Sequence, residues 1–191
     1  MSEPSPRTIP PGRIKLSYQD YLALPDDGKR YEIIEGDLYV TPSPTTRHQR
    51  ISKRILFLLM QELEEHGEGE VFNAPCDVLL DEHNVIQPDL IFVRQDNEAI
   101  VKEKNIQGTP DLLVEIVSPS TRRTDVMIKS RLYARFQVPH YWIVDPDLDR
   151  IEAFDLSEEG EYQLVKTFSS PEVLQLEAFP NLKIPLKAIF R

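Results

Sequence analysis

Two predicted strands each carry a carboxylate beside or among aliphatic residues. Asp89 precedes the run Leu90-Ile91-Phe92-Val93, and Glu115 lies inside the run 112–117. A lone charge in such surroundings is costly to bury unless it is paired or bound to a metal. Two carboxylates held close together repel each other, which favours a divalent cation or a proton between them. Because oxygen ligands of this type suit Mg²⁺ or Mn²⁺, Asp89 and Glu115 are candidate metal ligands.

Lys129 is the third group with chemical potential. In the predicted helix 121–137 it lies on the apolar stripe with Val126, Tyr133 and Phe136. A lysine beside a metal held by two carboxylates would orient water or stabilise the charge that develops during phosphodiester hydrolysis. Two alternatives remain open: Lys129 could reach solvent at the edge of the stripe, or it could pair with Asp125 one turn away.

Both carboxylates also have simpler interpretations. Asp89 follows Pro88 and could be the first residue of a strand, with its side chain in water. Glu115 could face water on an edge strand. Strand alternation places it on the face of Asp111, Leu113 and Val117, but the opposite face is apolar too. A strand covered on both faces is therefore the favoured interpretation of this run.

The surrounding pattern predicts an α/β or α+β fold, a central mixed sheet flanked by helices. A β-hairpin is expected near the N-terminus, around Gly36. Helical spacing of apolar residues predicts helices over 17–24, 46–66 and 121–137, with weak helical character over 98–104. The expected strands after the hairpin lie near 71–72, 77–80, 85–93, 112–117, 140–145, 151–156, 162–168 and 173–176. The order of the last residues, 182–190, is ambiguous.

Length and composition fit one compact domain over residues 13–191. The Pro- and Ser-rich segment 1–12 is expected to be a flexible arm. The single cysteine excludes an internal disulfide and suits a cytoplasmic location. No apolar run approaches the roughly 20 residues that a membrane span needs, so no membrane association is expected.

The formal net charge of −10 argues against unspecific nucleic-acid binding, but the charge is uneven. The segment 43–60 carries Arg47, Arg50, Lys53 and Arg54 and no acid. The turn that begins the 121–137 helix carries two further arginines, Arg122 and Arg123. DNA, if bound, is expected against one of these two basic regions.

Several segments together resemble one known family. They are Tyr31-Glu32-Ile33-Ile34-Glu35-Gly36, His48, Gln87-Pro88-Asp89-Leu90, 110–121, the 125–133 helix and 138–146. Over about residues 18–156 the chain resembles the PD-(D/E)xK, or restriction-endonuclease-like, nuclease superfamily. More narrowly it is similar to the Uma-two family, also known as a domain of unknown function, DUF820.

The resemblance implies roles for individual residues. Asp89 matches the superfamily aspartate and Glu115 the acidic residue of the next strand, so both would bind Mg²⁺ or Mn²⁺. Val117 stands where the superfamily lysine would be, and Lys129 of the following helix takes its place. Glu32 resembles the N-terminal glutamate of the family, with Glu35 as its rival.

Further residues have weaker assignments. His48, Gln87 and Asp111 are additional site candidates. A lone histidine on a helix face is more often structural, and Ser118 and Ser120 are better explained as helix caps than as nucleophiles.

The function that the resemblance implies is a metal-dependent endonuclease that hydrolyses DNA, and many members of the superfamily act as homodimers. Two alternatives stay open: a non-catalytic nucleic-acid or protein interaction module that keeps the nuclease fold, or a metal-dependent hydrolase of a small anion. The net charge favours these two, and the intact set Asp89, Glu115 and Lys129 favours the nuclease.

Overall fold

A computed structural model describes residues 14–118, 122 and 124–191, so the expected flexible arm 1–12 lies outside the described residues. Its main element is a six-stranded sheet in the order β11-β10-β9-β8-β6-β3. The sheet is mixed as expected, because β8 and β9 run parallel while the other neighbours are antiparallel. In chain order its strands are β3 (Gly69–Asn73), β6 (Leu90–Arg94), β8 (Leu112–Ile116), β9 (His140–Asp145), β10 (Arg150–Leu156) and β11 (Tyr162–Ser169).

A second sheet of five strands contains the expected hairpin, which pairs β1 with β2 around Gly36. Its order is β2-β1-β5-β4-β7, with β4 and β7 parallel. Its strands are β1 (Arg30–Ile34), β2 (Asp37–Thr41), β4 (Val78–Asp81), β5 (Asn84–Ile86) and β7 (Ile106–Gln107). The sequence pattern predicted one central sheet and did not separate these strands from it.

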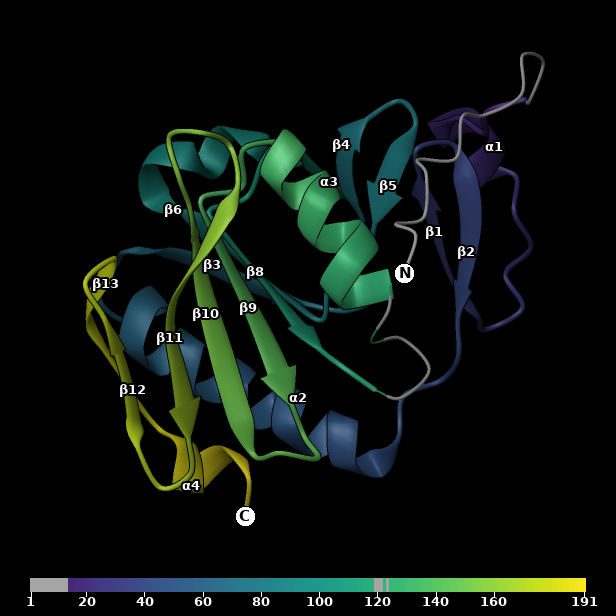
Figure 1. Ribbon diagram of the computed structural model, residues 1–191. Coiled ribbons are helices and arrows are strands. Elements are labelled where there is room, and N and C mark those ends of the chain that lie inside the picture. The colour runs from purple at the N-terminus through teal and green to yellow at the C-terminus, as the bar shows by residue number, and fades with distance from the viewer. Residues whose placement is uncertain (1–13, 119–121, 123) are drawn as a thin grey trace, which may run out of the picture.

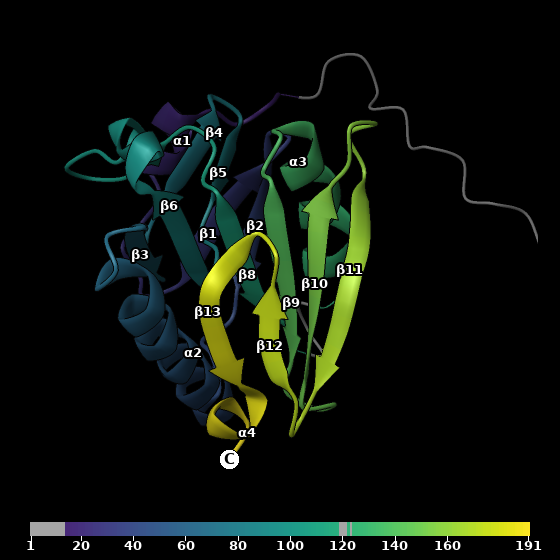
Figure 2. The ribbon, with the colours of Figure 1, turned by 90° about the vertical axis from the view of Figure 1, so that its left-hand side faces the viewer.

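The two faces of the six-stranded sheet are covered by different elements (Figures 1 and 2). On one face lie α2 (Thr46–Leu59), its π-helical extension (Met60–Glu64), the small sheet β12 (Val173–Leu176) and β13 (Phe179–Pro185), and α4 (Leu186–Ile189). On the other face lie α3 (Ser130–Arg135) and the five-stranded sheet. Alternate residues of β8 enter the two cores: Leu112 and Val114 face α2, and Leu113 faces α3.

The two carboxylate-bearing segments are neighbours, as predicted. Strand β6 pairs antiparallel with β8, and Leu90 lies opposite Val114. Asp89 and Glu115 flank this pair of residues, so the register alone brings their main chains together. Glu115 is buried, with 2 % of its surface exposed, so the edge-strand alternative is wrong.

The predicted single strand over 85–93 is two strands in different sheets. Strand β5 ends at Ile86 in the five-stranded sheet, and β6 begins at Leu90 in the six-stranded sheet. Pro88 explains the break, because it has no N–H to donate and it restricts the conformation of the residue before it. The link Gln87-Pro88-Asp89 therefore crosses from one sheet to the other.

Helix boundaries also differ from the predicted ones. The 46–66 helix is α-helical to Leu59 and then π-helical to Glu64, and the 121–137 helix is a π-helical turn (Thr124–Lys129) followed by α3. The short helix α1 (Tyr18–Leu22) has the expected Ser17 N-cap. The segment 98–104 was expected to be weakly helical, but only its first three residues are, as the end of a 3₁₀ helix (Gln95–Ile100). Within the described residues, no helix combines the length and the apolar character that crossing a bilayer requires.

Candidate active site

The link between the two sheets is held by side chains of β1. Arg30 and Glu32 are alternate residues of this strand and so point to the same side. The main-chain N–H of Gln87 donates to Glu32 Oε1 at 2.8 Å, and Arg30 Nη2 donates to the carbonyl of Gln87 at 2.9 Å. The five-stranded sheet thus supplies two charged groups, Arg30 and Glu32, to the point where the chain passes through Asp89 into the six-stranded sheet.

Asp89 is surrounded by donors. Its Oδ2 accepts the main-chain N–H of Ile116 at 2.9 Å and lies 3.0 Å from His48 Nε2, and its Oδ1 lies 3.3 Å from Arg30 Nη1. Burial alone would raise the pKa of Asp89, but His48, Arg30 and the Ile116 N–H together hold that pKa below its usual range. Asp89 is therefore a buried carboxylate that stays ionised, and the solvent-facing alternative is wrong.

Glu115 and Lys129 lie next to Arg30, Glu32 and Asp89, and these five charged residues are called the cluster below. Lys129 Nζ lies 3.0 Å from Glu115 Oε1 and 2.9 Å from Glu32 Oε1, so its ammonium bridges the two sheets. Tyr133, one helical turn further, donates its hydroxyl to Glu115 Oε1 at 2.6 Å. Burial, followed by the charges of Glu115 and Glu32, raises the pKa of Tyr133 well above its ordinary value, so it remains a neutral donor. Lys129 is 2 % exposed and points inward, which excludes the alternative in which it reaches solvent.

The structure distinguishes between the two rival glutamates of the hairpin. Glu32 is 1 % exposed and lies in the cluster. Glu35 sits at the turn with φ of 56° and makes an exposed ion pair with Arg135, at 2.7 Å. The suggested pair between Lys129 and Asp125 cannot be assessed, since the Asp125 side chain lies outside the described residues.

Two other candidates have different positions. Gln87 contacts the cluster through its main chain, and its side-chain Nε2 donates to Tyr21 Oη at 3.0 Å and Asp77 Oδ1 at 2.7 Å. Asp111 lies elsewhere: it accepts from the main-chain N–H of Arg94 and from the Asn97 side chain, both at 2.9 Å. The second Pro-Asp dipeptide of the chain therefore stabilises the start of β8 and its neighbouring turn.

Sequence reasoning missed Arg30 and the contact of Tyr133 with Glu115. The spacing of Arg30 two residues before Glu32, on one strand face, was an available signal for the first. The apolar stripe of the helix already placed Tyr133 beside Lys129, but a hydroxyl directed at Glu115 could not be read from it. His48 had only a weak assignment, and the structure places it against Asp89.

Comparisons with known proteins agree with this architecture. The family model Uma2, described as "Putative restriction endonuclease", matches residues 18–187. The chain belongs to the Uma2 family. An uncharacterized protein of Synechocystis sp. is 25 % identical over 180 residues, which cover 93 % of this chain and 92 % of that protein.

A crystal structure shows the same fold in another protein. It is described as "a putative nuclease belonging to DUF820" from Anabaena variabilis, and it superposes with a TM-score of 0.75 at 19 % identity. The match covers 92 % of this chain and 97 % of the other. This Uma2 protein thus has the restriction-endonuclease-like fold that the resemblance implied.

The cluster contains several carboxylates, the ligand type that Mg²⁺ and Mn²⁺ prefer. Its ionisable oxygens come from Glu32, Asp89 and Glu115, and the fixed cations among them are Arg30 and Lys129. The carboxylates therefore exceed the fixed cations by one charge. No three His, Cys, Asp or Glu side chains of the described segments form a ready ligand group. Because Mg²⁺ commonly uses one or two carboxylates and keeps several waters, Asp89 and Glu115 remain suitable ligands.

Tyr133 should contribute to stability through its bond to Glu115. Replacing Tyr133 with phenylalanine leaves the buried Glu115 without one charge-assisted hydrogen bond, and we expect a loss of about 1.5–3 kcal/mol in the free energy of unfolding. Urea unfolding at pH 7 measures this loss. The matched control is Tyr31→Phe, since the Tyr31 hydroxyl bonds the exposed Asp27 at 3.0 Å. Equal stability of both variants would mean that the Tyr133 hydroxyl is not a significant support for Glu115.

Proposed function

We propose that this protein is a metal-dependent endonuclease that hydrolyses phosphodiester bonds of DNA. The observation that carries the proposal is the buried ammonium of Lys129, held between Glu115 and Glu32. It lies in the cluster where β6, which begins directly after Asp89, pairs with β8, which carries Glu115. A purely structural role does not explain the burial of several charged side chains, because removing charges from water is costly. Membership of the Uma2 family supports the same conclusion.

Each charged residue has a defined task in this proposal. Asp89 and Glu115 would hold Mg²⁺ or Mn²⁺, and the ion would supply Lewis acidity for the phosphodiester and for a water molecule. The Ile116 N–H and His48 fix the orientation of Asp89. Lys129 stabilises the negative charge that develops on the phosphate oxygens.

Glu32 has a supporting role in the same proposal. It accepts from both Lys129 and the Gln87 main chain, and so keeps the ammonium and the link between the sheets in register. Glu32 can perform this positioning role without contacting the substrate.

The decisive experiment combines metal binding with DNA cleavage. Isothermal titration of Mn²⁺ should show binding, and a supercoiled plasmid should be nicked in the presence of Mg²⁺ or Mn²⁺ and left intact with EDTA. Metal binding without plasmid cleavage, but with hydrolysis of a small phosphate ester, would support the small-anion hydrolase. If the protein neither binds metal nor cleaves DNA, the result would support the interaction module.

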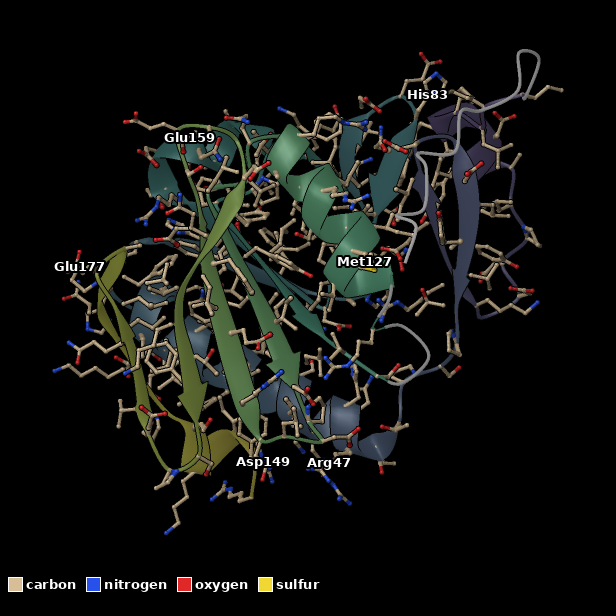
Figure 3. The ribbon with its side chains drawn as sticks, in the orientation of Figure 1. Arg47, His83, Met127, Asp149, Glu159 and Glu177 are labelled. Atoms are coloured by element: carbon tan, nitrogen blue, oxygen red, sulfur yellow. The ribbon has the colours of Figure 1, made fainter. Side chains whose placement is uncertain are left out.

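The surface of α2 offers a path for the DNA backbone that begins at the cluster. His48 near the helix start contacts Asp89, and the exposed residues Arg50 and Lys53 follow on its solvent side. Arg47 is already engaged, since it lies beside Asp149 at 3.0 Å and also bonds the carbonyl of Pro146 (Figure 3). Arg50 and Lys53 are therefore the residues of this helix best placed to bind phosphate groups.

The other basic region is less suitable. Arg122 pairs with the buried Asp145, so its charge is already neutralised. Arg123 lies outside the described residues.

Reversing the charges of α2 should weaken DNA binding. We expect Arg50→Glu with Lys53→Glu to lower duplex affinity by roughly tenfold or more at 0.1 M salt, and to reduce the salt slope by about two, since each lost phosphate contact removes about one. Fluorescence anisotropy over a salt series measures both. The matched control, Lys102→Glu with Lys104→Glu in the loop before β7, changes net charge equally. An equal loss in the control would indicate a general charge effect and would contradict this path.

A further inference from the structure

Arg30 reaches the cluster from the five-stranded sheet and is less enclosed than Lys129. It is the first residue of β1, on the face of Glu32. Its side chain is 19 % exposed, whereas that of Lys129 is 3 % exposed. Arg30 is therefore the fixed cation of the cluster that a molecule in solvent could touch.

The hydrogen-bonding capacity of the Arg30 guanidinium is incompletely used. Nη2 bonds the Gln87 carbonyl at 2.9 Å, while Nη1 lies 3.3 Å from Asp89, longer than the 2.7–2.9 Å typical of strong charge-assisted bonds. Its Nε is buried and has no partner among the described residues. A planar guanidinium with five N–H donors can bind a phosphate in a bidentate manner. The long Arg30–Asp89 contact could therefore be exchanged for a contact with a phosphate.

The charge balance of the cluster changes sign when a divalent ion binds. Glu32, Asp89 and Glu115 oppose Arg30 and Lys129, which leaves one net negative charge when histidine is taken as neutral. A divalent cation converts this to one net positive charge. A phosphodiester carries one negative charge and restores neutrality, so an anion is the complement of the loaded site.

Arg30 keeps its positive charge both before and after a metal binds. Burial alone would lower the pKa of its guanidinium, but the charges of Asp89, Glu115 and Glu32 raise that pKa above the ordinary value. The group is thus a permanent cation next to the carboxylate that is expected to take up the metal.

We propose that Arg30 is a further catalytic residue that serves as the counter-ion of Asp89 in the metal-free protein and contacts the scissile phosphate in the loaded one. The inference rests on the proposed nuclease function. It predicts two effects of opposite sign. Without Arg30 the metal has no competing cation at Asp89 and binds more tightly, while the phosphate loses a donor and cleavage slows.

The experiment compares Arg30→Met and Arg30→Lys with the wild type. For Arg30→Met we expect Mn²⁺ to bind about tenfold more tightly by isothermal titration, and plasmid cleavage at saturating Mn²⁺ to slow by about 10²-fold. Arg30→Lys keeps the charge and should return Mn²⁺ affinity close to the wild-type value. It should recover little of the cleavage rate, because an ammonium lacks the planar fork. Circular dichroism and thermal unfolding establish that each variant is folded.

The matched control is Arg135→Met, which removes an arginine from an exposed ion pair with Glu35 outside the cluster. It should leave both measurements unchanged. Weaker Mn²⁺ binding in Arg30→Met would mean that Arg30 only holds Asp89 in position, and would overturn the inference. Wild-type cleavage by Arg30→Met would do the same. If the wild type binds Mn²⁺ but cleaves no DNA, the nuclease proposal fails, while the titration still decides whether Arg30 competes with the metal. If the wild type binds no Mn²⁺, both proposals fail.

Discussion

Replacing Lys129 with methionine should lower plasmid cleavage by about 10²–10³-fold, the loss typical of one electrostatic stabiliser of the transition state. Methionine fills a similar volume but leaves Glu115 and Glu32 without the ammonium at 3.0 and 2.9 Å. Removing one partner of a buried ion pair is strongly destabilising, and we expect about 3–5 kcal/mol less free energy of unfolding. Mn²⁺ binding should persist, since Asp89 and Glu115 are unchanged. Single-turnover cleavage, urea unfolding and isothermal titration measure the three quantities.

A second variant separates stability from catalysis. Adding Glu32→Gln to Lys129→Met removes one of the two stranded carboxylates, so much of the lost stability should return. Cleavage should stay low, because no cation is restored. Lys129→Arg should rescue cleavage poorly, since the site is 2 % exposed and shaped for one compact ammonium. If the double variant regains cleavage along with stability, Lys129 acts only as a structural ion-pair partner.

Replacing Asp89 with asparagine should abolish Mn²⁺ binding and lower cleavage by about 10³-fold or more. The amide has nearly the same shape, but it cannot supply an anionic oxygen to the metal, whose Lewis acidity is worth several kcal/mol of barrier. The chain contains its own control in Asp111→Asn. Asp111 is also preceded by proline and followed by leucine, but it bonds Arg94 and Asn97 away from the cluster.

Only Asp89→Asn should lose metal binding and activity, whereas Asp111→Asn should affect stability alone. Circular dichroism of both variants guards against misfolding as the cause. Unchanged Mn²⁺ affinity in a folded Asp89→Asn protein would remove Asp89 from the site.

The sequence by itself determined most of the elements and the face on which Glu115 lies. The continuous run 112–117 predicted a strand covered on both sides, and alternation put Leu113 on the face of Glu115 and Leu112 on the other. The structure confirms both. Helical periodicity likewise placed Lys129 and Tyr133 on one stripe, and in the structure both side chains reach Glu115. These inferences succeeded because residue spacing within one element is fixed by local backbone geometry.

The tertiary structure decided which charged residues meet. Two acids of the hairpin, Glu32 and Glu35, look alike in sequence, and only the position of β1 beside the crossing link buries the first and exposes the second. The two Pro-Asp dipeptides are equally ambiguous. The Asp89 dipeptide crosses between sheets into the cluster, while the Asp111 dipeptide starts β8 at its far end. Arg30 joins Asp89 across 59 positions of the chain. Spacing within β1 places Arg30 on the face of Glu32, but it does not place either residue beside Asp89, because that contact depends on how two separate sheets pack.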